Sequence, residues 1–259
     1  MTLSIHSHLV YDYAEATDVL VQVEAAQLPD QIVSSPEVWL TPVTHFMRVA
    51  GHDEVGERIW LRVAGRMALD YKAQVTVTRP AVDLAYLPAT DPRWLPGEVI
   101  DYLMPSRFCP SDRFVEFVSS DFADLSGGAC VAALADWVTA NMTYVPGASH
   151  AGTCATDTFV QRQGVCRDYA HLLIALVRAA SIPARYASVY APDVTPPDFH
   201  AVAEVFLDGN WHLIDATGMA KPSDMARIGV GRDAADTPFL SSFGQASFVE
   251  QFVKVERVS

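Results

Sequence analysis

The chain has 259 residues and a mass of 28.3 kDa, enough for one large domain or two smaller ones. Half of the residues are hydrophobic and only 19% are charged, which provides for a sizeable core and excludes intrinsic disorder over most of the length. The net charge of −13 repels phosphate backbones and anionic lipids, so we expect neither a nucleic-acid nor a membrane partner.

No segment of the sequence has the character of a membrane helix. The longest apolar run, residues 172–177, is far shorter than the ~18 uninterrupted residues that such a helix needs. The first residues also lack the basic and apolar regions of a signal peptide. We therefore expect a cytoplasmic location.

The cysteines do not have the spacing of a zinc site, a redox dithiol or a disulfide framework, because no two of them form a CxxC pair. The four are Cys109, Cys130, Cys154 and Cys166. The histidines show no metal-ligand spacing either, so we expect free thiols, no metal and no cofactor.

The first 80 or so residues alternate between apolar and polar side chains in several places, which is the period of a β-strand. In YKAQVTV, residues 71–77, one face carries Tyr71, Ala73, Val75 and Val77. Residues 19–23 and 59–63 repeat the pattern. This part is predicted to form an antiparallel β-sandwich-like domain with one solvated side.

A proline-rich crossover follows. Six of the 16 prolines lie between Pro80 and Pro110, and proline both removes a backbone donor and keeps its predecessor out of the helical region. We place the boundary near Arg107, with a β-rich N-terminal domain of residues 1–107 and a second domain of residues 108–259.

Beyond the boundary the apolar period changes to that of helices. Residues 129–141 carry one apolar stripe, whereas residues 167–180 are apolar nearly all round, which predicts a central buried helix. That helix should end at Ser181-Ile182-Pro183. A strand at 185–191 and a hairpin at 200–216 around Asp208-Gly209 follow, which predicts an α+β second domain.

Cys166 opens the predicted buried helix, directly after Gly164-Val165. Unpaired N–H groups and the positive end of the helix dipole stabilise a thiolate at such a position, so Cys166 is a candidate nucleophile. The alternative is a packed core thiol, and for an isolated cysteine beside an apolar run that is the commoner case.

The hairpin supplies candidate partners for this thiol. With Asp208-Gly209 as a two-residue turn, His200 faces Thr217 and Asp215 is its diagonal neighbour on the same face, about 7–8 Å away at the backbone. Asp215 can then orient His200, and His200 can deprotonate Cys166. Taken alone, His200 is more often a surface histidine, and Asp215 more often a turn residue.

Three separated blocks resemble one family. GVCRDYAHLLIALVRAASIPARYASVY, DFHAVAEVFLDGNWHLIDATG and RIGVGRDAADTP occur in the order typical of the transglutaminase-like superfamily of cysteine-dependent enzymes, particularly its bacterial members. The resemblance spans residues 137–238. It implies a papain-like α+β core with Cys166 as nucleophile, His200 as general base and Asp215 as orienting carboxylate, preceded by a β-rich domain.

The sequence departs from the pattern common in relatives at three positions: Ser181, Val202 and Ala216. We expect the last two to alter the substrate cleft and the loop after Asp215. The third block should form a loop near the active site. The backbone N–H of Cys166 should bind the oxyanion, together with either Tyr144 or Gln163. Arg167 and Asp168 are interpreted as a local ion pair.

These residues predict a cysteine-dependent acyl-transfer enzyme acting on amide bonds, with a peptide, a protein or a small amide as substrate. Water as acceptor makes a protease or amidase, which we favour, and an amine as acceptor makes a transglutaminase. The alternative from another class is a non-catalytic binding module on the same fold.

Overall fold

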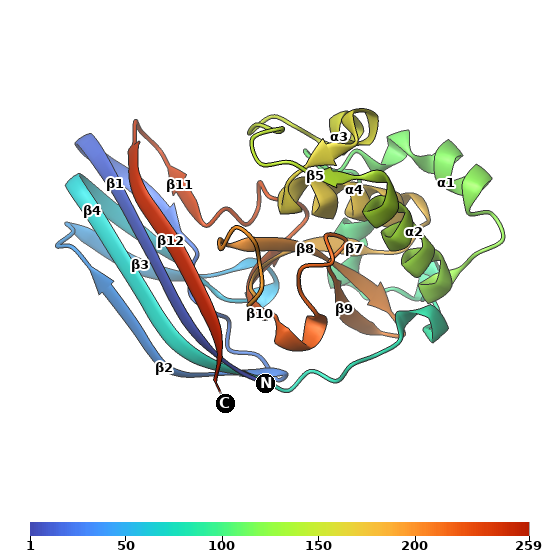
Figure 1. Cartoon of the computed structure of the whole chain (residues 1–259), viewed down its shortest axis with the longest axis horizontal. Helices are drawn as coiled ribbons and strands as arrows, with labels where there is room; N and C mark the ends of the chain where they lie inside the picture. Colours follow the sequence, from blue (N-terminus) through green and yellow to red (C-terminus); the bar gives the residue numbers. More distant parts are fainter. Residues whose placement is uncertain (259) are drawn as a thin grey trace.

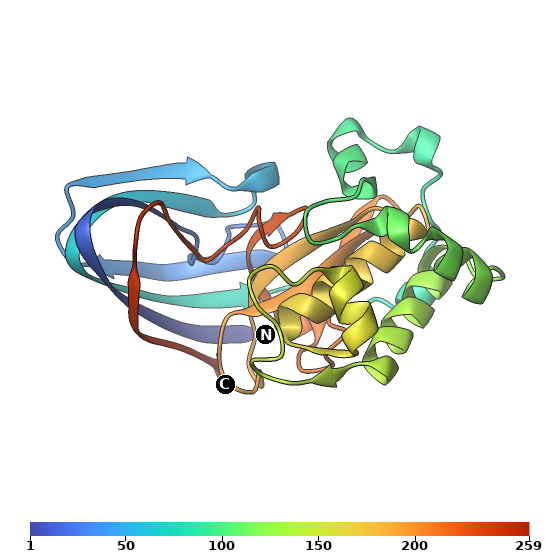
Figure 2. The ribbon, with the colours of Figure 1, turned by 90° about the horizontal axis from the view of Figure 1, so that it is seen from above.

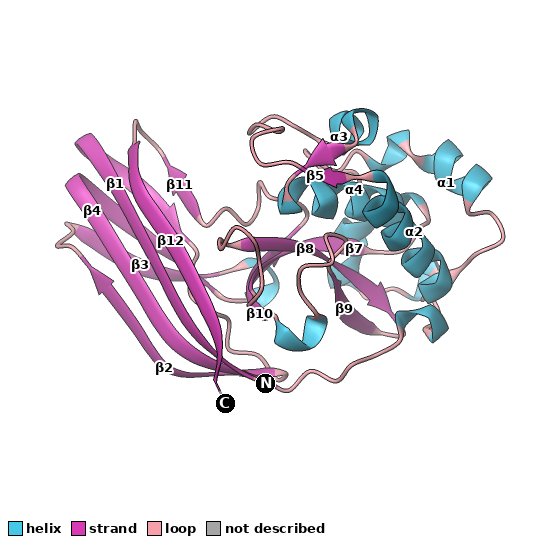
Figure 3. Ribbon diagram, viewed as in Figure 1, coloured by secondary structure: helices cyan, strands magenta, loops and turns pink. Residues whose placement is uncertain are grey.

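Two antiparallel sheets and a layer of helices make up residues 1–258, the part of the chain that the computed structural model describes (Figures 1 and 3). The first sheet contains β1 (Thr2–Val21), β2 (Gln31–Leu40), β3 (His45–Ala50), β4 (Glu57–Val77), β11 (Leu240–Ser242) and β12 (Ser247–Val258). Its order is β11-β1-β4-β2, with β12 also paired to β1 and β3 to β4. Within residues 1–258, no helix is long and apolar enough to cross a bilayer.

The alternation predicted for the first sheet is confirmed. Tyr71, Ala73, Val75 and Val77 are at most 5% exposed, whereas Lys72 and Gln74 are exposed on the other face. The α+β class is confirmed as well. The strands nevertheless form a single sheet, and the layer that covers its buried face comes from the rest of the chain.

The sheet is built from both ends of the chain. β12 pairs with β1 from Thr2↔Val258 to Asp12↔Ser247, and β11 pairs with the end of β1. Residues 240–258, which we assigned to the second domain, therefore complete the first sheet. The reason is that β1 would otherwise expose a long row of unpaired backbone groups along its free edge.

The second sheet has the order β10-β7-β8-β9, and the helices cover one of its faces (Figure 2). Its strands are β7 (Ala184–Tyr190), β8 (His200–Leu207), β9 (Asn210–Ile214) and β10 (Ala226–Gly231). The helices are α1 (Val115–Asp121), α2 (Gly127–Asn141), α3 (Ala155–Gln161) and α4 (Cys166–Ala179). A two-stranded parallel pair, β5 (Thr143–Tyr144) and β6 (Gln163–Gly164), lies beside them.

The proline-rich segment between the two sheets forms short 3-10 turns instead of long elements, as expected from its composition. They are Leu84–Tyr86, Pro92–Trp94, Gly97–Leu103 and Ser111–Arg113, and two more turns of this kind, His52–Glu54 and Pro222–Asp224, lie elsewhere in residues 1–258.

A buried ion network joins the two sheets. Glu204 on β8 is fully buried, and its two oxygens lie 2.7 Å from Arg185 on β7 and 2.7 Å from Arg227 on β10. Those arginines also pair with Asp53 and Asp30, which belong to the loops of the first sheet. Burial would raise the pKa of Glu204, but the two guanidinium groups outweigh it and lower the pKa.

Glu204→Gln should lower the free energy of unfolding at pH 7 by about 3 kcal/mol, because it removes the buried carboxylate and leaves Arg185 and Arg227 with only the partly exposed Asp53 and Asp30 as charge partners. A lowered pKa stabilises the fold fully above the ordinary glutamate pKa of 4.5, so the difference from wild type should shrink as the pH falls below that value. Urea unfolding at several pH values measures both. Glu116→Gln, at an exposed position, is the control, and equal losses in the two variants would contradict the role of the network.

Candidate active site

The sequence GVCRD builds the beginning of α4. The Asp168 carboxylate accepts a hydrogen bond from the Val165 N–H at 2.8 Å, which caps the first turn, and a salt bridge of 3.2 Å ties it to Arg167. A side chain at Gly164 would lie 2.6 Å from the Asp168 Cβ, so only glycine fits there. The ion pair expected from the sequence is present, and its effect is to fix the position of Cys166.

His200 and Asp215 meet as the hairpin register predicts. Leu207 pairs with Asn210 across the turn, and His200 Nε2 lies 2.9 Å from Asp215 Oδ2. Both side chains are at most 2% exposed. The predicted register is therefore confirmed, because the turn has two residues and keeps the parity of the strands.

The Asp215 carboxylate is held by further donors. It accepts hydrogen bonds from the Thr217 N–H and hydroxyl, at 2.9 and 2.7 Å, and from the Ala220 N–H at 2.9 Å. Burial would raise the pKa of Asp215, but the hydrogen bonds and charge of His200, together with Thr217, lower it. The group is thus an ionised and immobile partner for the imidazole. Nothing in the sequence predicted that the backbone N–H of Ala220 would donate to this carboxylate.

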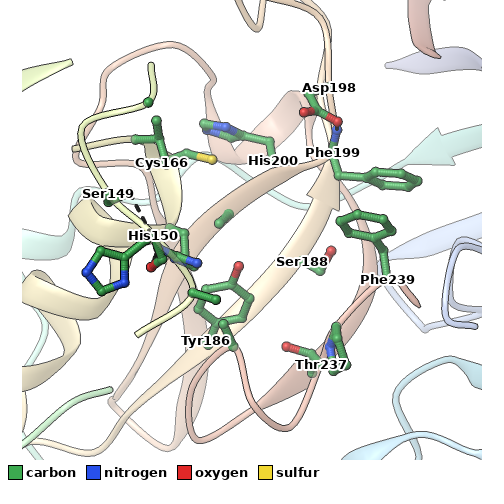
Figure 4. A pocket seen from close by; sticks show the side chains of 17 residues that line it. Ser149, His150, Cys166, Tyr186, Ser188, Asp198, Phe199, His200, Thr237 and Phe239 are labelled. Atoms are coloured by element: carbon green, nitrogen blue, oxygen red, sulfur yellow. Dashed lines mark hydrogen bonds between the residues drawn. The ribbon is translucent and has the colours of Figure 1, made fainter. Parts of the chain in front are cut away.

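The sulfur of Cys166 lies against the imidazole of His200 (Figure 4). The second ring nitrogen, Nδ1, is buried and makes no conventional hydrogen bond within residues 1–258, so it is the atom available to the thiol. Burial would lower the pKa of His200, but Asp215 and Cys166 outweigh it and raise the pKa to about 9. The arrangement favours a charged imidazole beside the sulfur at neutral pH.

These side chains open into a cleft of about 480 Å³, whose lining extends from Cys166 at the start of α4 to Phe239, which packs against the core of the first sheet. Successive residues on one face of β7 show how it forms. Tyr186 packs in the cluster around α4, Tyr190 packs against the first sheet, and Ser188 between them lines the cleft. Phe199 and Phe239, stacked at 4.9 Å, form part of its wall.

The third sequence block was expected to form a loop, but its first part, residues 227–231, belongs to β10, because it pairs with β7. The loop that follows forms another wall of the cleft. Ala234, Thr237 and Pro238 line the cleft, and the backbone N–H of Ala234 donates to His171 Nε2 at 3.1 Å. His171 is fully buried in α4 and stacks on Phe108, with ring centroids 5.1 Å apart. Burial lowers the pKa of His171 to about 3, so it accepts this hydrogen bond as a neutral imidazole.

One of the two suggested oxyanion donors lies beside the sulfur. Burial, followed by the charge of the nearby Cys166, raises the pKa of the Tyr144 hydroxyl to about 12. It therefore keeps its proton at neutral pH. The other suggested donor, Gln163, is exposed on β6.

The two departures from the family pattern that were expected to alter the cleft lie in the interior instead. Val202 is 1% exposed and belongs to the cluster that contains Ala187 and Leu213. Ala216 is 5% exposed and its carbonyl accepts a hydrogen bond from Thr139. Neither side chain lines the cleft, because each points into packed core.

Comparisons with known proteins identify the family of the chain. Residues 118–216 match the family model described as the transglutaminase-like superfamily. The crystal structure of a proposed cysteine protease from Cytophaga hutchinsonii is 33% identical, with a TM-score of 0.91 over 99% of this chain and 90% of that one.

Curated relatives from mycobacteria are more distant. An uncharacterized protein of Mycobacterium leprae is 27% identical over 145 residues, covering 52% of each chain. Another, from Mycobacterium tuberculosis, is 28% identical over 165 residues, covering 58% of this chain and 48% of that one. The chain thus spans about half the length of the curated relatives it matches.

The geometry predicts that limiting iodoacetamide modifies Cys166 before the other three cysteines. Burial raises the pKa of Cys109 and Cys130, and Cys154 donates its thiol proton to Asp157, whereas Cys166 has an imidazole beside it to accept the proton. Mass spectrometry of the labelled peptides gives the order. His200→Ala should abolish the preference, and earlier labelling of Cys154 would contradict the assignment.

Proposed function

The chain belongs to the transglutaminase-like superfamily, and on that basis we propose that it is a cysteine-dependent acyl-transfer enzyme acting on amide bonds, with Cys166, His200 and Asp215 as its catalytic residues. The observation that carries the proposal is the alignment of the three groups. The thiol at the start of α4 lies against an imidazole whose far nitrogen is 2.9 Å from a buried carboxylate.

Each group has a defined role in acyl transfer. His200 takes the proton from Cys166, and the sulfur attacks the carbonyl carbon of the amide. Asp215 holds the imidazole in the tautomer and orientation that this requires, and stabilises its charged form. The tetrahedral intermediate carries a negative oxygen, for which the backbone N–H of Cys166 and the hydroxyl of Tyr144 are the proposed donors.

The tetrahedral intermediate then collapses to a thioester, which water hydrolyses. The C–N bond breaks as His200 gives its proton to the leaving amine, and the acyl group remains on Cys166 as a thioester. His200 then takes a proton from water, and the hydroxide adds to the thioester. The C–S bond breaks as His200 returns this proton to the sulfur, which releases a carboxylic acid and restores the free thiol.

We favour water as the acceptor because the cleft is accessible. His150 and Ala151 on its rim are exposed, and Cys166 itself is partly exposed, so solvent reaches the thioester. Transfer to an amine needs a dry channel that raises the effective concentration of the amine. The proposed substrate class is a peptide, a protein or a small amide, and the Cytophaga relative supports the protease form.

Turnover of a fluorogenic peptide amide tests the catalytic residues, with Cys166→Ala as the inactive reference. Asp215→Asn should lower turnover by about 10⁴, because the amide no longer fixes the imidazole tautomer. The carboxylate also accepts two backbone N–H groups, so activity must be expressed per folded molecule. Asp208→Asn in the same hairpin is the matched control and should leave turnover unchanged. Full activity of Asp215→Asn per folded molecule would contradict the assignment.

The product ratio tests the acceptor. Millimolar primary amine added to a cleavable substrate should barely change the yield of free acid, since water reaches the thioester and is present at about 55 M. Chromatography of acid and amide products measures the ratio. Predominantly amine-linked product would assign the chain as a transglutaminase and leave the three catalytic residues in place.

A further inference from the structure

The cleft contains an acidic side chain that the acyl-transfer steps do not use. Asp198 lines the cleft two residues before His200, where the chain enters β8. Figure 4 shows Cys166, His200 and Asp198 in that order along one side of the cleft. In this view Asp198 lies on the same side of the sulfur as His200.

The carboxylate of Asp198 has neutral partners only. It accepts hydrogen bonds from the Phe199 N–H at 2.7 Å and from Gln251 Nε2 at 2.6 Å. Within residues 1–258, no lysine, arginine or histidine side chain forms a salt bridge with it. Asp198 is exposed to solvent on one side, but its partial removal from water raises its pKa and the two hydrogen bonds do not cancel the effect. A bound cation would stabilise its charged form.

The charge of Asp198 also reaches the reacting centre. After burial and Cys166, it is among the groups that raise the pKa of Tyr144, which lies near Cys166. A charged group of the substrate near Cys166 is therefore within the field of Asp198.

The order of Cys166, His200 and Asp198 along the cleft indicates which part of the substrate lies near Asp198. His200 gives its proton to the leaving amine, so the leaving group must lie on the His200 side of the sulfur. We propose that Asp198 determines specificity by binding a positively charged group, a basic side chain or a free amino group, on the leaving-group side of the scissile amide. This inference rests on the proposed function, because it assumes attack by Cys166.

Thiol reagents of different charge test the inference without a known substrate. Methanethiosulfonates with a trimethylammonioethyl, a sulfonatoethyl or a methyl group all convert a thiolate into a mixed disulfide and release methanesulfinate. Cys154→Ser is a suitable background, because it removes the other partly exposed thiol and serine is favoured at the helix N-cap that Cys154 occupies.

In that background, the ratio of cationic to anionic rates at Cys166 should fall about five- to tenfold on Asp198→Asn at low ionic strength, each rate being normalised to the neutral reagent. The difference should shrink in high salt because of screening. Asp124→Asn, the same charge change at an exposed position outside the cleft, should leave the ratio unaltered.

Two results would overturn the inference, and they are distinguishable. An unaltered ratio in Asp198→Asn, with Cys166 still the reactive thiol, removes the role of Asp198 and leaves the proposed function standing. Failure of Cys166 to react faster than Cys154 in the wild-type chain removes the proposed function and this inference with it.

Peptide amides extend the test to turnover. With lysine or glutamate as the residue after the scissile bond, kcat/KM for the lysine substrate should exceed that for the glutamate substrate, and Asp198→Asn should lower this preference about tenfold. A merely structural role for Asp198 would change both substrates equally and would overturn the inference.

Discussion

Helix α4 is packed on every side from Tyr169 to Val177, and the positions of the other active-site groups are set relative to it. A helix buried all round cannot rotate without exposing apolar surface or opening cavities, each of which costs several kcal/mol. Its first residue, Cys166, is therefore held in a fixed position at the edge of the core. Asp168 and Gly164 fix the turn that precedes it.

The cleft forms where the helix layer and the first sheet both pack against β7. β7 contributes Tyr186 to the cluster around α4 and Tyr190 to the cluster of the first sheet, and the space between them becomes the cleft. The network centred on Glu204 joins the second sheet, which includes β7, to the loops of the first sheet. The first sheet thus has a role in shaping the site although it carries none of the proposed catalytic residues, and the return of β11 and β12 to that sheet brings Phe239 to the cleft wall.

Local patterns were enough to predict much of this arrangement. Period-two alternation identified the long strands, the apolar run identified α4, and the two-residue turn placed His200 beside Asp215. What failed depended on long-range contacts. The pairing of β12 with β1 joins residues about 250 positions apart, and the interior location of Val202 depends on packing across the second sheet. The partners of Glu204 and His171 come from four separate segments, and no local pattern encodes them.

The central claim is that Cys166, His200 and Asp215 act as one coupled unit, and an NMR titration of histidine-labelled protein tests it most directly. His200→Gln identifies the His200 signal. The account predicts a titration midpoint near pH 9 in the wild type, shifted downward in both Cys166→Ala and Asp215→Asn, because each partner stabilises the charged imidazole. A midpoint near the ordinary value of 6.5 that neither substitution moves would contradict the account.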